Sequence, residues 1–134
     1  TGSTRDVILA RVGESYLVAA EAYYKAGNTD KAVERINVVR KRAAAAGYDM
    51  SIKASDVSID FILDERAREL AGEYHRWMDL KRTGKLIEYA VKYNPNIIGA
   101  DYFKGVDGQN KILRPIPLDA INLNQAKVEQ NPGY

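Results

Sequence analysis

The sequence contains no cysteine and only one histidine, His75, in 134 residues. Without cysteine the chain forms no disulfide, carries no thiol nucleophile and offers no thiolate to a metal. A single histidine does not complete a zinc site or a Ser-His-Asp triad. No GxGxxG or GxxxxGK[ST] string is present to hold a nucleotide phosphate. We therefore expect neither a metal nor a cofactor.

Long apolar runs and an excess of one charge are also missing. No run approaches the roughly 18 apolar residues of a membrane span, and no signal-peptide pattern opens the chain. The 20 basic residues are interspersed with 18 acidic ones, so no single-sign field attracts nucleic acid. With 46% hydrophobic residues, residues 1–134 are predicted to form one globular unit. Because the chain begins at Thr1 without a methionine, we expect it to be a piece of a longer protein.

Two helices are predicted over residues 5–47. The first runs from Asp6 to Ala26 and is ended by Gly27, and both Asn28 and Thr29 are suitable caps for the second. The apolar face of the first helix consists of Ile8, Val12, Tyr16, Ala19, Ala20 and Tyr23. The spacing of a tetratricopeptide repeat, in which two antiparallel helices interlock, is matched by Tyr16, Ala19, Ala20, Tyr23, Gly27, Ala32, Ile36 and Val39. The fold class is thus all-α with one tetratricopeptide-like hairpin, a unit that normally packs on neighbouring repeats.

A third helix, the motif helix, is predicted over residues 58–84. Its apolar positions recur at helical spacing and place Trp77 in the core, while the pattern leaves open whether Gly72 divides it. A short helix follows and ends before Pro95. Residues 97–134 hold three of the four prolines and are predicted to form an irregular tail.

The motif helix mixes acids and bases in a way that permits two interpretations. Two carboxylates at a controlled separation could act as acid and base in glycoside hydrolysis. Arginines on the same helix instead favour ionised, paired carboxylates, because buried charges are normally paired. We predict a structural ion-pair network of Glu21, Glu65, Arg66, Glu69 and Arg76. Arg66 lies on the apolar line of the helix, and its expected partner is Glu69 or Glu21.

Aromatic side chains are the remaining resource for binding, because their faces stack on sugar rings. Candidate ligand contacts are Tyr93, Tyr102 and Phe103, which lie in the less regular part of the sequence. The alternative role of the same rings is to fix that segment in place.

Four segments together resemble the C-terminal part of the SusD/RagB family of glycan-binding outer-membrane lipoproteins. In chain order they read RVGESYLVAAEAYYKAGNTDKAVERINVVRKRA, ILDERARELAGEYHRWMDLKRTG, RPIP and QNPGY. The resemblance implies a helical body of tetratricopeptide-like hairpins and a non-catalytic protein. It also implies an oligosaccharide ligand, a TonB-dependent transporter as partner, and surface exposure through an N-terminal lipid anchor that is absent from this chain.

In that family, sugar-binding residues lie mostly in loops outside these segments, so the matching residues here are expected to act mainly as scaffold. The alternative function is a tetratricopeptide-type module for protein–protein interaction. An enzyme that acts on glycans through its carboxylates ranks third.

Overall fold

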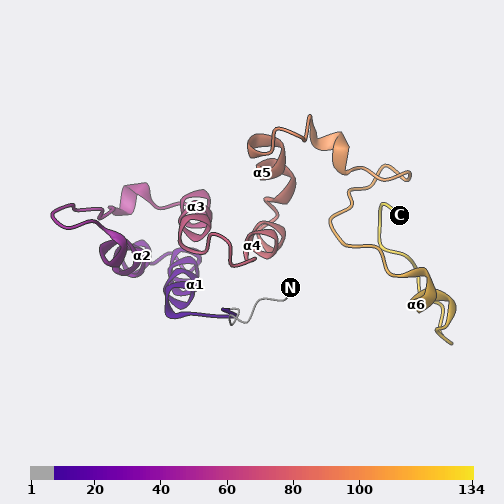
Figure 1. The fold of residues 1–134 in the computed structure, drawn as a ribbon, viewed down its shortest axis with the longest axis horizontal. Helices are drawn as coiled ribbons and strands as arrows, with labels where there is room; N and C mark the ends of the chain where they lie inside the picture. Colours follow the sequence, from indigo (N-terminus) through magenta and orange to yellow (C-terminus); the bar gives the residue numbers. More distant parts are fainter. Residues whose placement is uncertain (1–7) are drawn as a thin grey trace, which may run out of the picture. The chain divides into compact units, whose positions relative to one another are not determined.

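The computed structural model describes residues 8–134, which are helical and contain no named strand. In chain order the helices are α1 Val12–Lys25, α2 Thr29–Ala43, α3 Ile59–Glu69, α4 Arg76–Arg82, α5 Leu86–Tyr93 and α6 Leu118–Asn122, with 3₁₀ helices η1 Ala54–Asp56 and η2 Ala100–Phe103 (Figure 1). The all-α prediction is confirmed. The chain divides into two compact units, Thr1–Arg76 and Trp77–Tyr134.

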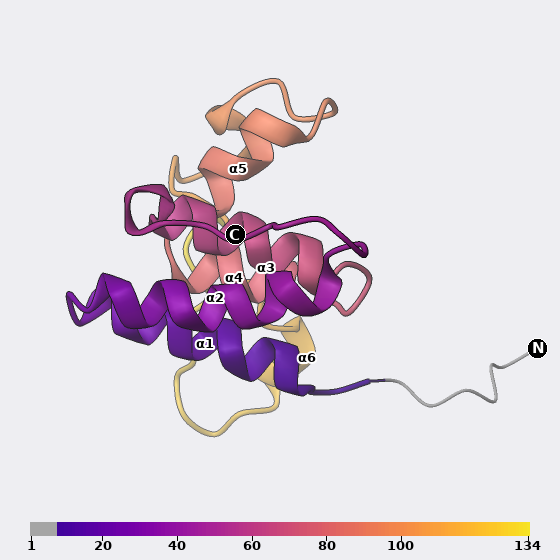
Figure 2. The ribbon, with the colours of Figure 1, turned by 90° about the vertical axis from the view of Figure 1, so that its left-hand side faces the viewer.

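Helices α1 and α2 form an antiparallel hairpin within the first unit (Figure 2). Gly27 makes the turn possible because its φ of 77° is in the left-handed region. The side chain of Asn28 caps α2 by accepting a hydrogen bond from the Lys31 amide at 3.2 Å. The predicted start of the first helix at Asp6 lies outside the described residues, and residues 8–11 are not helical. Ile8 therefore does not extend the apolar face, and it is 56% exposed.

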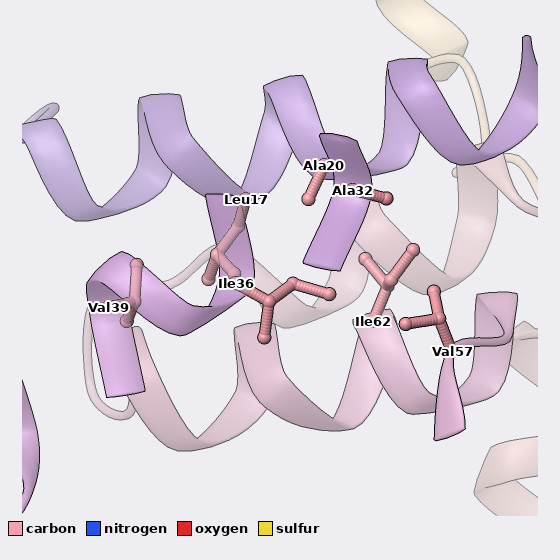
Figure 3. Packing of buried hydrophobic residues seen from close by; sticks show 7 residues of the cluster. All are labelled: Leu17, Ala20, Ala32, Ile36, Val39, Val57 and Ile62. Atoms are coloured by element: carbon pink, nitrogen blue, oxygen red, sulfur yellow. The ribbon is translucent and has the colours of Figure 1, made fainter. Parts of the chain in front are cut away.

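The core of the first unit lies between α1, α2 and α3 (Figure 3). Its cluster consists of Leu17, Ala20, Ala32, Ile36, Val39, Val57 and Ile62. Leu17, Ile36 and Ile62 come from three different helices, and each is fully buried. Small residues at Ala20 and Ala32 allow α1 and α2 to approach closely (Figure 3). The helical periodicity of the sequence predicted the inward face of α2 through Ala32, Ile36 and Val39. On α1 it was right for Ala20, but it missed the fully buried Leu17 and included Val12, which is 70% exposed.

The segment predicted as one motif helix at 58–84 forms two helices, because Gly72 divides it. The side chain of Ser58 caps α3 by accepting from the Phe61 amide at 3.0 Å. Helix α3 ends at Glu69, and Gly72 then adopts a φ of 79°. The break changes the helical phase, so residues beyond it do not continue the apolar stripe of α3. This corrects the predicted core position of Trp77, which is 40% exposed.

The second unit contains α5, which packs against η2, and a C-terminal segment that contacts residues 103–117. The Gln130 side chain forms two hydrogen bonds with the backbone of Ile116, at 2.7 and 2.9 Å. Asp107 accepts a hydrogen bond from the Gly133 amide at 2.9 Å. A hydrogen bond from the Gln109 amide, together with this one from the Gly133 amide, lowers the pKa of the Asp107 carboxyl, because both stabilise its ionised form. Side chain to backbone hydrogen bonds thus fix residues 130–133.

We expect Gly105→Ala to release the C-terminal segment. A Cβ at Gly105 would overlap the backbone of Gly133, which cannot rotate out of the way as a flexible side chain can. Hydrogen exchange should therefore become much faster at the Gly133 amide, while the amides of α1 and α2 keep their protection. Gly99→Ala is the matched control, because a Cβ there meets no atom within 4 Å. Unchanged exchange at Gly133 would contradict this contact.

Candidate functional site

Charged side chains of the first unit form two groups of ion pairs, one between α2 and α3 and the other between Arg11, which precedes α1, and α2, α3 and the segment after α3. We call the two groups together the arginine–glutamate network, and its members are Arg11, Arg40, Arg42, Arg68, Glu65, Glu69 and Glu73. Glu65 is buried, and its Oε2 accepts from Arg40 Nη1 at 2.7 Å and from Arg68 Nη2 at 2.6 Å. Arg40 therefore connects α2 to α3 with a charge-assisted hydrogen bond.

Glu69 and Glu73 form the second part of this network. The Glu69 side chain accepts from Arg42 Nη2 at 2.6 Å and also from Arg11 Nη1. Arg11 reaches Glu73 Oε1 from its Nη2 at 2.8 Å. These contacts with Glu73 and Glu69 raise the pKa of the Arg11 guanidinium, and the Arg11 hydrogen bond lowers the pKa of the Glu73 carboxyl. The Glu73 carboxylate is thus favoured in its ionised form.

Among the described residues of the first unit, Arg66 is the most buried cation, with 3% of its surface exposed. Its Nη2 lies 3.3 Å from Oε1 of Glu14 on α1, and the same oxygen lies 3.4 Å from Nδ1 of His75. The predicted pairing of Arg66 with Glu69 or Glu21 stays a prediction. Glu21 is itself buried and accepts from Lys25 Nζ at 2.7 Å.

Arg76, the last predicted member of the ion-pair network, contacts α3. Its Nη1 donates to the backbone oxygen of Leu63 at 2.7 Å, and its Nη2 lies 3.7 Å from Oδ1 of Asp64. The Arg76 guanidinium therefore links the first residue of α4 to α3. All five predicted residues therefore lie in contact with opposite charges.

The chemical consequence of this pairing is that neither Glu65 nor Glu69 is arranged as a general acid. A general acid must present its carboxyl group to a substrate, whereas the carboxylates of Glu65 and Glu69 already accept hydrogen bonds from arginines. Residues 8–134 contain no group of three or more His, Asp or Glu side chains placed to hold a metal ion. The network is suited to joining helices.

The three aromatic candidates lie in the second unit, on α5 and η2, two elements that pack together. Tyr93 stacks at a tilt on Tyr89, with ring centroids 5.3 Å apart. Tyr102 and Phe103 form an edge-to-face pair, with centroids 6.4 Å apart. Tyr102 is 69% exposed, Tyr93 is exposed and Phe103 is partly buried. We call these two contacts the aromatic pairs.

Sequence reasoning missed several members of the network. Arg40 and Arg42 lie in the last turns of α2, where cations interact favourably with the negative end of the helix dipole. That role explained them without any contact with α3. The available signal was the spacing of Glu65 and Glu69, which lie one turn apart and face basic residues on α2. Arg11 and Glu14 carried no comparable signal, because their partners are more than 50 positions away.

Comparison with known proteins gives consistent matches over the whole chain. The profile described as "SusD family" matches residues 1–134. A SusD-like protein of Formosa agariphila is 33% identical over 137 residues, which cover 95% of this chain and 24% of that protein. The starch-binding protein SusD of Bacteroides thetaiotaomicron is 33% identical over 135 residues, which cover 96% of this chain and 22% of that protein. The chain spans about a quarter of the length of these curated relatives, and no solved structure gives a significant match.

Proposed function

The chain belongs to the SusD family, and from this we propose that it takes part in non-catalytic binding of glycans at the outer-membrane surface. The observation that carries the proposal is the family match over all 134 residues, together with a starch-binding relative among the similar proteins. The proposed partner is a TonB-dependent transporter. The proposed attachment is an N-terminal lipid anchor outside these residues, and residues 8–134 contain no helix with the length and apolar content of a membrane crossing.

Within this function, the chain supplies mainly the helical scaffold. Support comes from the first unit, where the apolar core and the arginine–glutamate network use the buried faces of α1, α2 and α3. The paired carboxylates also argue for binding without hydrolysis. If hydrolysis of a glycan were detected and were lost in Glu69→Gln with binding intact, the non-catalytic proposal would fail.

The aromatic pairs are the part of this chain that we propose for direct glycan contact. Tyr93 and Tyr102 expose ring surface to solvent, and a sugar presents C–H groups that pack on such a surface. Tyr89 and Phe103 restrict the rings from behind, so less rotational freedom is lost on binding.

We expect Tyr102→Ala in the complete gene product to weaken binding of its oligosaccharide about three- to tenfold, as loss of one aromatic contact implies. A glycan array would identify the oligosaccharide, and calorimetry would measure its affinity. Tyr48→Ala is the matched control, because Tyr48 is also an exposed tyrosine but belongs to the first unit. Equal affinity of the two variants would remove the aromatic pairs from the proposal, and an array without any bound oligosaccharide would overturn glycan binding itself.

A tetratricopeptide-type interaction module is the second candidate, and one observation favours it. The hairpin carries an open groove of ≈ 350 Å³ whose walls include Tyr16, Tyr23 and Arg35. Such a groove can accept a peptide or helix. Purification from native membranes separates the two functions: recovery of a transporter supports the first, and recovery of a soluble protein without a transporter supports the second.

A further inference from the structure

A pocket of ≈ 410 Å³ lies within the first unit, between the end of α2, the loop after it and α3. We call it the α2–α3 pocket. Its volume is within the range of about 300–1,000 Å³ that is usual for small-molecule sites. Its lining is apolar at residues 43–45, Tyr48 and Met50 and charged at Arg40, Arg68, Glu65 and Glu69. Because two arginines face two glutamates, the lining as a whole favours neither an anion nor a cation.

The apolar side of the pocket is held in place by hydrogen bonds from α2. Arg40 Nε donates to the backbone oxygen of Met50 at 2.6 Å. Asn37 forms two hydrogen bonds with the backbone of Ile52, at 3.2 and 2.9 Å. The Tyr48 side chain is nevertheless 73% exposed, and Met50 is also exposed. The pocket therefore presents apolar surface in a defined position.

The polar side of the pocket contains a buried carboxylate with one unused oxygen. The side chain of Glu65 is only 7% exposed. Its Oε2 accepts from Arg40 Nη1 at 2.7 Å and from Arg68 Nε and Nη2 at 3.1 and 2.6 Å. Its Oε1 accepts no hydrogen bond from residues 8–134, and this oxygen is not sealed from solvent. Because buried acceptors are normally satisfied, we infer that Oε1 accepts from a group that enters the pocket.

The two arginines that contact Glu65 also keep unused donors. Arg40 donates through Nε and Nη1, and Arg68 donates through Nε and Nη2. In the described part of the chain, Arg40 Nη2 and Arg68 Nη1 donate no hydrogen bond. A polar head that reaches Glu65 Oε1 therefore meets one acceptor and nearby N–H donors.

Charged ligand heads do not meet both requirements. A carboxylate accepts from arginine, but it has no proton to donate to Glu65 Oε1 and would face a second negative charge there. An ammonium group donates to Glu65 but is repelled by the two guanidinium groups that hold Oε2. A sugar ring is also a poor fit, because several of its hydroxyl groups would lie unpaired against the alanines and Met50. The pocket is suited to an apolar body with one uncharged polar head.

We propose that the α2–α3 pocket binds a small uncharged carboxamide with an apolar body. The amide N–H donates to Glu65 Oε1, and the amide C=O accepts from a free N–H of Arg40 or Arg68. The apolar body packs on Tyr48 and Met50, where it excludes water from these hydrogen bonds. This site is independent of the proposed glycan contacts, which lie in the other unit.

The chain offers a direct probe of the pocket, because it contains only two methionines, Met50 and Met78. With ¹³C-methyl-labelled methionine, 4-phenylbutyramide is expected to shift the Met50 signal saturably and to leave the Met78 signal in place. N,N-Dimethyl-4-phenylbutyramide keeps the ring and the C=O but has no N–H, so it should bind about tenfold more weakly. The charged analogues 4-phenylbutyrate and 4-phenylbutylamine should also each bind about tenfold more weakly. No saturable Met50 shift, or an analogue that binds as tightly as the primary amide, would overturn the proposal.

Variants separate the ligand contact from a structural effect. In Glu65→Gln the arginines hold the side-chain oxygen, because they only donate, so the NH₂ group faces the pocket and cannot accept from the ligand. We expect about tenfold weaker binding of 4-phenylbutyramide. Glu73→Gln is the matched control, because it alters an arginine contact outside the pocket. Its affinity should equal that of the unchanged protein.

A second pair of variants tests the position of the ligand without changing any charge. Ala44→Phe should abolish the Met50 shift by filling the pocket, whereas Ala46→Phe, outside the lining, should not. Thermal unfolding establishes that each variant is folded. Tyr102→Ala should leave the Met50 response unchanged, so a failure of the glycan contacts would not affect this result. If folded Glu65→Gln or Ala44→Phe binds the amide as the unchanged protein does, or if methyl glucopyranoside binds equally well, the proposal is wrong.

Discussion

Replacement of Ile36 by alanine is expected to lower the free energy of unfolding of the first unit by about 2–5 kcal/mol. Ile36 is fully buried at the centre of the cluster that joins α1, α2 and α3. Removal of its side chain takes away apolar contact area and leaves a cavity that the three helices cannot close without moving. Urea unfolding followed by circular dichroism measures the change.

Val38→Ala supplies the control for this core substitution. Val38 lies two positions away on α2, but its side chain is exposed, so its removal leaves no cavity. We expect its effect to stay within about 0.5 kcal/mol. Similar losses for both variants would mean that burial at Ile36 is not the cause, and the position of the core would be wrong, because alanine itself has a higher helix propensity than either residue.

Arg66→Met is expected to destabilise the first unit by about 3 kcal/mol, toward the low end of the cost of removing one partner of a buried ion pair. The guanidinium of Arg66 is buried against Glu14, and methionine cannot satisfy that carboxylate. Because Glu14 is partly exposed, water recovers some of the loss. Urea unfolding of the single variants and of the double variant with Glu14→Gln gives the coupling between the two side chains.

Arg68→Met is the control for the buried arginine. Arg68 also contacts a glutamate of α3, but more than half of its side chain is exposed, so we expect a loss of at most about 1 kcal/mol. If Arg66→Met cost no more than Arg68→Met, the buried charge would have no structural role.

The sequence predicted the hairpin of α1 and α2 well, because local signals decide it. Helical periodicity identified Ala20 of α1 and Ile36 of α2 as inward-facing, although it missed Leu17, and Gly27 and Asn28 marked the turn. The end of α5 before Pro95 followed from the steric restriction that proline places on the preceding residue. Features of this kind depend on residues within one or two turns of each other.

The break at Gly72 shows where local signals stop being sufficient. A glycine in a helical pattern costs about 1 kcal/mol, and that cost alone does not decide whether the helix continues. In the structure the helix ends, Tyr74 adopts a φ of 63°, and Trp77 leaves the predicted stripe. The contact of Glu69 with Arg11 was equally inaccessible, because Arg11 approaches from a distant part of the sequence.

The C-terminal segment has a consequence for which changes it tolerates. Gln130 and Asn131 bind backbone atoms of Ile116 and Arg114, so their hydrogen bonds do not depend on which side chains occupy those two positions. They do depend on the spacing of the residues within each of the two contacting segments. One residue inserted between positions 114 and 116 would shift the backbone atoms away from the Gln130 and Asn131 side chains. Positions 114 and 116 can therefore diverge in side-chain chemistry while the spacing is kept, except that proline at 116 would remove the amide that donates to Gln130.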